Sequence, residues 1–159
     1  MISSRIIFSL IVLAIFVASC DSNRVYEDNR DFDGKFWHVD TVPSFEFSIQ
    51  DHDIAYNALV NIRNAFNYPF YNLYYQYELL DSMGKPLKKD LVEIHLFNQT
   101  SGKPLGDGLG DLFDHQQQII EKLTFPSRGN YSIRLKQYMR MDSLPSILSV
   151  GVRIEKAID

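Results

Sequence analysis

Apolar and polar residues alternate along most of the chain beyond residue 40. The alternation is clearest in seven short segments, which span residues 45–49, 56–62, 73–79, 91–97, 119–125, 131–135 and 148–154. A period of two residues is typical of a β-strand with one buried face and one solvated face. The pattern therefore predicts seven strands, and the stretch "VYE" at 25–27 adds a candidate eighth strand at an edge.

The connections between these segments favour a single all-β domain. Turn-forming sequences such as "DSMGKP" at 81–86 and "FPSRGN" at 125–130 separate them, and no segment has the period of an amphipathic helix. Short strands joined by polar turns predict an antiparallel β-sandwich, jelly-roll-like, of about seven to eight strands. Within the fifth segment we expect Ile119, Leu123 and Phe125 on the buried face, with Glu121 in solvent between them.

The first twenty residues have a different character. Arg5 precedes an apolar run over 6–18, which Ser19 and Cys20 follow. A basic start, a short apolar stretch and small residues before a cleavage site mark a secretory signal, and the run is too short to span a bilayer comfortably. The ending "VASC" resembles a bacterial lipobox, in which a peptidase cuts before the cysteine. We expect a lipoprotein signal peptide at 1–19 and a lipid-anchored domain at 20–159. An ordinary secreted protein with a free thiol is the alternative.

Cysteine and charge content limit the contacts of the mature chain. Cys20 is the only cysteine, so no intramolecular disulfide can form. Arg5 is the only charged residue before it, so cleavage changes the formal net charge from −4 to −5. Because an acidic chain lacks the basic stripe that binds nucleic acid, we expect no such partner. The membrane contact is expected from acyl chains on Cys20, with the polar residues after it acting as a short tether.

The stretch "GKPLGDGLGDLFD" at 102–114 contains three closely spaced glycines, Gly106, Gly108 and Gly110, among three aspartates. A dinucleotide fingerprint needs a different glycine spacing that opens a helix, and a phosphate loop needs a lysine and a hydroxyl after its last glycine. Two interpretations remain. One is a Gly-rich connection between strands whose aspartates make turn hydrogen bonds. The other is a calcium site at Asp107, Asp111 and Asp114, although the spacing is not that of an EF-hand.

No catalytic constellation stands out in the sequence. The chain lacks the G-x-S-x-G motif of a nucleophile elbow. Its histidines are scattered without a metal-ligand spacing, at His38, His52, His95 and His115. We therefore expect no catalytic residue and no cofactor, and a hydrolase ranks below the alternatives that involve binding.

Aromatic residues concentrate in "NYPFYNLYYQY" at 67–77. Tyr75 and Tyr77 share a face with leucines, so we expect them in the core, whereas Tyr74 falls on the opposite, exposed face. A surface glycan-binding module is the alternative function, by analogy with other β-sandwich folds. It would require an exposed aromatic platform drawn from Trp37, Tyr68, Phe70, Tyr71 and Tyr74.

Three sequence blocks and the lipobox together resemble one known family. The blocks are "NIRNAFNYPFYNLYYQYEL", "GKPLGDGLGDLFD" and "YSIRLKQYMRMDSLPSILSVGVRIEK". In combination they resemble the GldH family of gliding-motility lipoproteins from Bacteroidetes. The resemblance implies a non-catalytic, lipid-anchored envelope protein associated with gliding motility and type IX secretion machinery, in contact with other envelope proteins of that apparatus. It implies Cys20 as the lipidation site. We expect the outer membrane rather than the inner membrane, and the leaflet stays open.

Three short motifs add candidate modification sites. O-glycosylation in exported proteins of Bacteroidetes resembles a pattern of aspartate, then serine or threonine, then an apolar residue. The chain matches it at Thr41, Ser82 and Ser143. Ser82 is the most accessible of the three on sequence grounds, because it lies beside the turn sequence "GKP".

Overall fold

The computed structural model describes residues 21–158, and its regular structure consists of β-strands. One sheet has five strands in the order β1 (Arg24–Asp31), β11 (Ile147–Lys156), β4 (Tyr56–Ala65), β8 (Leu112–Leu123) and β7 (Asp107–Leu109). The second sheet has four strands in the order β3 (Ser44–Ile49), β9 (Gly129–Gln137), β5 (Asn72–Leu80) and β6 (Pro86–His95). A short ribbon pairs β10 (Ser143–Pro145) with β2 (Phe36–His38).

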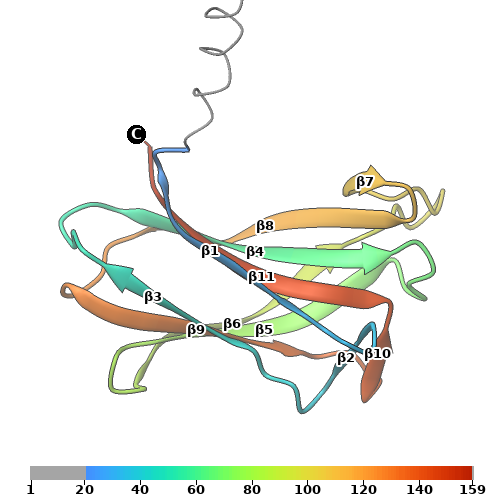
Figure 1. The fold of residues 1–159 in the computed structure, drawn as a ribbon, viewed down its shortest axis with the longest axis horizontal. Coiled ribbons are helices and arrows are strands. Elements are labelled where there is room, and N and C mark those ends of the chain that lie inside the picture. The colour runs from blue at the N-terminus through green and yellow to red at the C-terminus, as the bar shows by residue number, and fades with distance from the viewer. Residues whose placement is uncertain (1–20, 159) are drawn as a thin grey trace, which may run out of the picture.

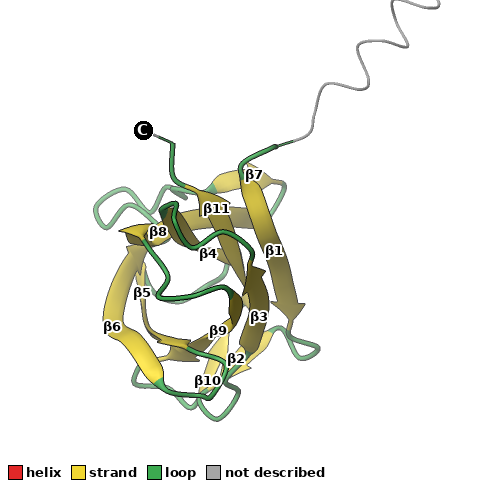
Figure 2. Cartoon of the chain, turned by 90° about the vertical axis from the view of Figure 1, so that its left-hand side faces the viewer, coloured by secondary structure: helices red, strands yellow, loops and turns green. Residues whose placement is uncertain are grey.

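The two sheets face each other as a sandwich, and every strand pair is antiparallel (Figures 1 and 2). The predicted fold class is confirmed. All seven predicted segments contain strands, and the candidate edge strand at 25–27 lies in the first half of β1.

Alternation of side chains builds the core between the sheets. Along β4, Ala58, Val60 and Ile62 are buried and their neighbours are not. Tyr75 and Tyr77 lie in the same core, as predicted, with exposed fractions of 0% and 1%. Full burial of one such large apolar side chain contributes about 1.5–3 kcal/mol, so this interior accounts for most of the stabilisation.

The strand beginning at Leu112 corrects one expectation about register. The fifth predicted segment started at 119, whereas β8 starts at Leu112 and ends at Leu123. Its pairing with β4 shifts between Ala58 and Leu59, and Ile120 becomes the buried residue while Ile119 is only half-buried. A β-bulge of this kind moves later side chains to the other face. Ile119, Leu123 and Phe125 still contact the core and Glu121 is exposed, as predicted, but the prediction missed the burial of Ile120.

The residues after Cys20 form structure almost at once. Cys20 lies outside the described residues, and β1 starts at Arg24, so 21–23 are the only described residues before the first strand. The backbone N–H of Lys156 donates to the carbonyl oxygen of Asn23 at 2.8 Å, which ties this entry point to the end of β11. None of the described residues forms a helix long and apolar enough to cross a bilayer.

Candidate functional site

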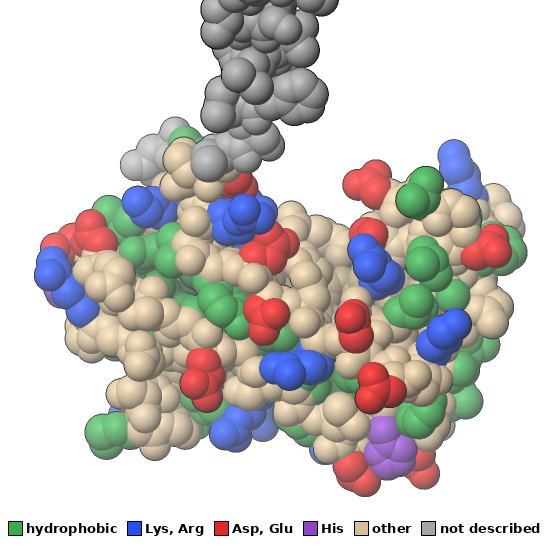
Figure 3. All heavy atoms as spheres, viewed as in Figure 1, with side chains coloured by type: hydrophobic (Ala, Val, Ile, Leu, Met, Phe, Trp, Pro, Cys, Tyr) green, Lys and Arg blue, Asp and Glu red, His purple; other side chains and the backbone are tan. Residues whose placement is uncertain are grey.

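A large hollow lies on the outer face of the five-stranded sheet. It is a groove of about 550 Å³ with a mainly polar lining from β1, β4, β8, β7 and β11. Figure 3 shows this hollow between the part of the molecule where the described chain begins and the lobe that contains β7. Its lining residues are Glu27, Asn29, Asp31, Asn61, Ile62, Arg63, Asp107, Asp114, His115, Gln116 and Ser149.

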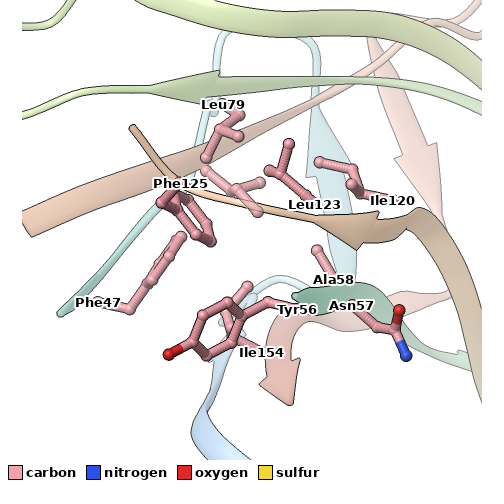
Figure 4. Close-up of a pocket in the computed structure, with 10 residues that line it drawn as sticks. Phe47, Tyr56, Asn57, Ala58, Leu79, Ile120, Leu123, Phe125 and Ile154 are labelled. Carbon is pink, nitrogen blue, oxygen red and sulfur yellow. The ribbon is translucent and has the colours of Figure 1, made fainter. Parts of the chain in front are cut away.

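The interior of the sandwich, by contrast, has no room for a ligand at its main void. Apolar side chains from both sheets, among them Phe47, Leu79 and Phe125, point toward one another around it (Figure 4). The void measures about 10 Å³. That volume is at most the room for about one water molecule, and its lining is apolar. Any binding chemistry therefore belongs to the surface.

A ladder of amide side chains crosses the groove floor. Gln116 Nε2 donates to Asn61 Oδ1 at 2.8 Å, and Asn61 Nδ2 donates to Glu27 Oε1 at 2.9 Å. These residues come from β8, β4 and β1, each at an outward position of its alternating strand. Asn61 thus links the side chains of β8 and β1 across the outer face of β4.

Arg63 and Asp114 form a two-pronged ion pair beside this ladder. Arg63 Nε lies 2.7 Å from Asp114 Oδ1, and its Nη2 lies 3.0 Å from Oδ2. The hydrogen bond to Asp114 raises the pKa of Arg63. Both side chains are about half exposed, so the pair holds β4 and β8 in register but adds little stability.

A second cluster centres on Arg153 at the other end of the groove, where the described chain begins. Arg153 contacts the carboxylates of Asp21, Glu27 and Glu155. Burial acts to lower the pKa of Arg153, but the hydrogen bonds to Asp21 and Glu155 outweigh it and raise that pKa. The hydrogen bond from Arg153 in turn lowers the pKa of Asp21. Sequence patterning gave no sign of this cluster, because its members lie far apart along the chain.

His115 is the one groove residue whose polar atom is buried without a partner. Its Nε2 makes no hydrogen bond with any residue the structure describes, and its side chain is 8% exposed. Burial lowers its pKa, while Asp114 and Asp107 act in the opposite direction. A Cβ on Gly106 would lie 2.7 Å from this Nε2, so only glycine fits against the ring.

The glycine-aspartate stretch is a β-hairpin rather than a simple connection between strands. β7 pairs with the start of β8 through Asp107 and Asp114, and Gly110 turns the chain with φ of 66°. Asp111 accepts a backbone hydrogen bond from Phe66 through its carbonyl oxygen at 2.8 Å. Asp114 is held by Arg63, as described above. Within residues 21–158, no three carboxylates, imidazoles or thiols gather where they could hold a metal ion, so the arrangement gives no support to calcium.

The five candidate aromatics do not form an exposed platform. Trp37 and Tyr68 are buried, with exposed fractions of 0% and 6%. Phe70 and Tyr71 are half-buried against the core, and Tyr74 is exposed on the outer face of β5, as predicted. The structure therefore offers no support for glycan stacking at these positions.

The candidate O-glycosylation residues are all on the surface. Thr41 lies between β2 and β3, Ser82 lies in the β5–β6 turn, and Ser143 begins β10. The turn around Ser82 is well ordered, because Asp81 Oδ1 accepts hydrogen bonds from the backbone of Met83 and Lys85 at 2.9 Å each.

Comparison with known proteins gives one consistent result. Residues 24–154 match the family described as GldH lipoprotein. The chain is 32% identical over 157 residues to the gliding motility lipoprotein GldH of Flavobacterium johnsoniae. The aligned region covers 92% of this chain and 94% of that protein. It is 31% identical over 158 residues to a protein of Christiangramia forsetii named gliding motility lipoprotein GldH homolog, with 95% of each chain covered.

Similarity to solved structures is weak. An arabinose-bound GH51 α-L-arabinofuranosidase is 9% identical with a TM-score of 0.37, and the match covers 73% of this chain and 17% of that one. Dimeric latent PorU from Porphyromonas gingivalis is 9% identical with the same TM-score of 0.37, covering 87% and 14%. The chain spans less than a fifth of either protein, and neither likeness carries an argument about function.

Proposed function

The chain belongs to the GldH lipoprotein family, and from that premise we propose that it is a non-catalytic, lipid-anchored component of a gliding motility apparatus in the cell envelope. The observation that carries this proposal is the match to two proteins named gliding motility lipoproteins over nearly the whole length of each chain. Because the shared region includes all eleven strands or parts of them, the common function belongs to the whole domain.

The anchor in this proposal is a lipid on Cys20. A thiolate is the nucleophile suited to accept a diacylglyceryl group. Each buried methylene contributes about 0.8 kcal/mol, and two or more chains hold a protein firmly in a bilayer. The mass of a Cys20→Ala variant should lack the lipid. A Cys20→Ala variant whose mass still includes the lipid would rule Cys20 out as the attachment site.

A structural role fits the chemistry of the groove. The polar side chains of its floor bond to one another, as Gln116 does to Asn61 and Arg63 does to Asp114. Such pairs link β4 to β8 across the outer face of the sheet, as expected of a surface that keeps its shape. The function we propose is therefore contact with other envelope proteins, including those of type IX secretion machinery.

Capture from native membranes tests this role. A C-terminal tag on the full chain should recover the same envelope proteins in repeated, gently solubilised preparations. The Cys20→Ala variant is the matched control, because it keeps the folded domain and loses the anchor. Recovery of the tagged protein alone, from membranes that contain it, would count against a place in a complex.

We further propose that the protein resides in the outer membrane. Separation of the two membranes by density should place it with outer-membrane porins. Co-migration with inner-membrane markers would overturn this part of the proposal without affecting the anchor.

An O-linked glycan on Thr41, Ser82 or Ser143 is an additional proposal, and Ser82 is the preferred site because its turn is exposed and ordered. The intact mass of the mature protein from its native host should exceed that of peptide plus lipid. Ser82→Ala should remove the excess. A mass equal to peptide plus lipid removes the proposal.

A further inference from the structure

The described chain begins on one particular face of the sandwich. Asp21 contacts Arg153, and Arg153 projects from β11 on the outer face of the five-stranded sheet together with Glu155. Cys20 directly precedes Asp21, and consecutive Cα atoms are about 3.8 Å apart. If Cys20 carries the lipid, the membrane surface must therefore lie close to this end of this face.

A second feature projects from the same face at its other end. The groove on the outer face is lined both by Glu27, which contacts Arg153, and by Asp107 of β7. The β7–β8 hairpin thus forms the far wall of the groove. Figures 1 and 2 both place β7 on the same side of the sandwich as the start of the described chain, with the four-stranded sheet on the other side.

The hairpin presents an exposed apolar surface, here called the hairpin patch. Leu109 at the tip is 89% exposed, and its strand partner Leu112 is 39% exposed. Leu105, just before β7, is 54% exposed, and Phe66, whose backbone N–H donates to the carbonyl oxygen of Asp111 in the same turn, is 56% exposed. The patch has a firm base, because the ring of Phe66 packs against those of Phe97 and Phe113 with centroid separations of 6.2 and 6.3 Å. Because Leu109 and its strand partner Leu112 are exposed together on a supported turn, they form an apolar surface and not a single scattered apolar residue.

We propose that the hairpin patch inserts into the interface of the same bilayer that holds the lipid on Cys20, so that the domain rests on the membrane at both ends of one face. This inference depends on the lipid anchor of the proposed function. β4, which runs along this face, has ten residues. At a rise of about 3.3 Å per residue, the anchored end and the patch are separated by roughly the length of one strand. Because only a few residues link the lipid to a rigid sheet, tilting about the anchor brings Leu109 into contact with the bilayer.

The charge of the face indicates which lipids suit it. Four carboxylates and one arginine line the groove between the two contacts: Glu27, Asp31, Asp107, Asp114 and Arg63. Such a surface favours the ammonium groups of zwitterionic lipids and is repelled by anionic headgroups. The bilayer we infer therefore presents mainly phosphatidylethanolamine-like headgroups to this face.

A site-specific fluorescent probe tests the proposal in the full lipoprotein. Leu109→Cys introduces a thiol that can be labelled with an environment-sensitive dye, and Met83→Cys is the matched control. Met83 is 88% exposed, but it lies in the β5–β6 turn of the other sheet. Each lipoprotein is reconstituted into phosphatidylcholine–phosphatidylethanolamine vesicles with or without nitroxide-labelled phosphatidylcholine. Vesicle flotation and dye stoichiometry report the anchor separately, because a lipidated Cys20 has no free thiol to label.

We expect one dye per chain, flotation with the vesicles, and a blue-shifted, nitroxide-quenched signal at Leu109 but not at Met83. Flotation with no quenching at either position would overturn the inserted patch and leave the anchor intact. Quenching at both positions would overturn the proposed orientation. Failure to float, with two dyes per chain, would instead refute lipidation of Cys20 and the inference with it.

Discussion

Replacing Tyr75 with Phe removes one hydroxyl group from the interface between the two sheets. Tyr75 of β5 is fully buried, and its hydroxyl donates to Gln117 Oε1 of β8 at 2.9 Å. Gln117 Nε2 donates in turn to the carbonyl oxygen of Glu93 in β6 at 3.0 Å. One glutamine therefore connects the five-stranded sheet to two strands of the four-stranded sheet. Burial raises the pKa of Tyr75, so the hydroxyl remains a donor throughout the neutral range.

The cost of the substitution follows from the group it leaves behind. Phe keeps the ring and its packing, but the Oε1 atom of Gln117 loses its donor. An acceptor stranded away from water costs about 1–3 kcal/mol, and Gln117 is only partly buried, which favours the lower half of that range. We expect Tyr75→Phe to reduce the free energy of unfolding by about 1.5 kcal/mol. For a domain of this size, that corresponds to a fall in Tm of about 5 °C.

Urea and thermal unfolding of the domain from Asp21 onward measure this effect, with Tyr77→Phe as the control. The ring of Tyr77 is as buried as that of Tyr75, but its hydroxyl has no hydrogen bond to any described residue. The control should change stability by less than about 0.5 kcal/mol. If Tyr75→Phe proves as stable as the wild type, or if both variants lose the same amount, the bridge through Gln117 contributes nothing and the reasoning fails.

Three further predictions concern the groove. Gly106→Ala should lower stability by about 1–3 kcal/mol in urea unfolding, because its Cβ would collide with the ring of His115 and the backbone of Asp114. Burial lowers the pKa of His115 below 6.5, so on acidification the unfolded chain takes up this proton before the folded chain does. The free energy of unfolding should therefore fall as pH drops through 6.5. In His115→Gln, the part of this pH dependence that comes from His115 should disappear. Arg63→Gln should cost only about 0.5–1 kcal/mol, and less in high salt, because the pair with Asp114 is exposed.

Local alternation was enough to predict the sandwich, because most strands have one buried face and one wet face. It missed the first half of β8 for a specific reason. There the inward positions are His115 and Gln117, so the stretch is polar on both faces. Gln117 is tolerated there because it accepts a hydrogen bond from Tyr75 and donates one to the backbone of Glu93, both in the opposite sheet. No local sequence pattern reveals these partners.

The short strands could not be predicted from the sequence for a different reason. β2, β7 and β10 have three residues each, too few to show a period. β7 is exposed throughout, and it exists because Asp107–Leu109 folds back on β8. The three closely spaced glycines at 106, 108 and 110 suggested a ligand-binding loop. Two of them, Gly106 and Gly110, instead serve close packing on His115 and a left-handed turn.

The position of the candidate site depends most on β1, the strand whose role the sequence understated. Its residues are largely charged, and on sequence grounds this composition suggested a spacer. In the structure they are exposed or only partly buried. They form a strand because the neighbouring β11 offers a complete backbone edge and because Arg153 compensates the carboxylates of Asp21 and Glu27. With β1 paired from Arg24 onward, little free chain remains between Cys20 and the folded domain. If Cys20 carries the proposed lipid, the fold itself sets the orientation of the domain on its membrane, and the proposal of the inserted hairpin patch requires the face with the groove to be held toward the lipid.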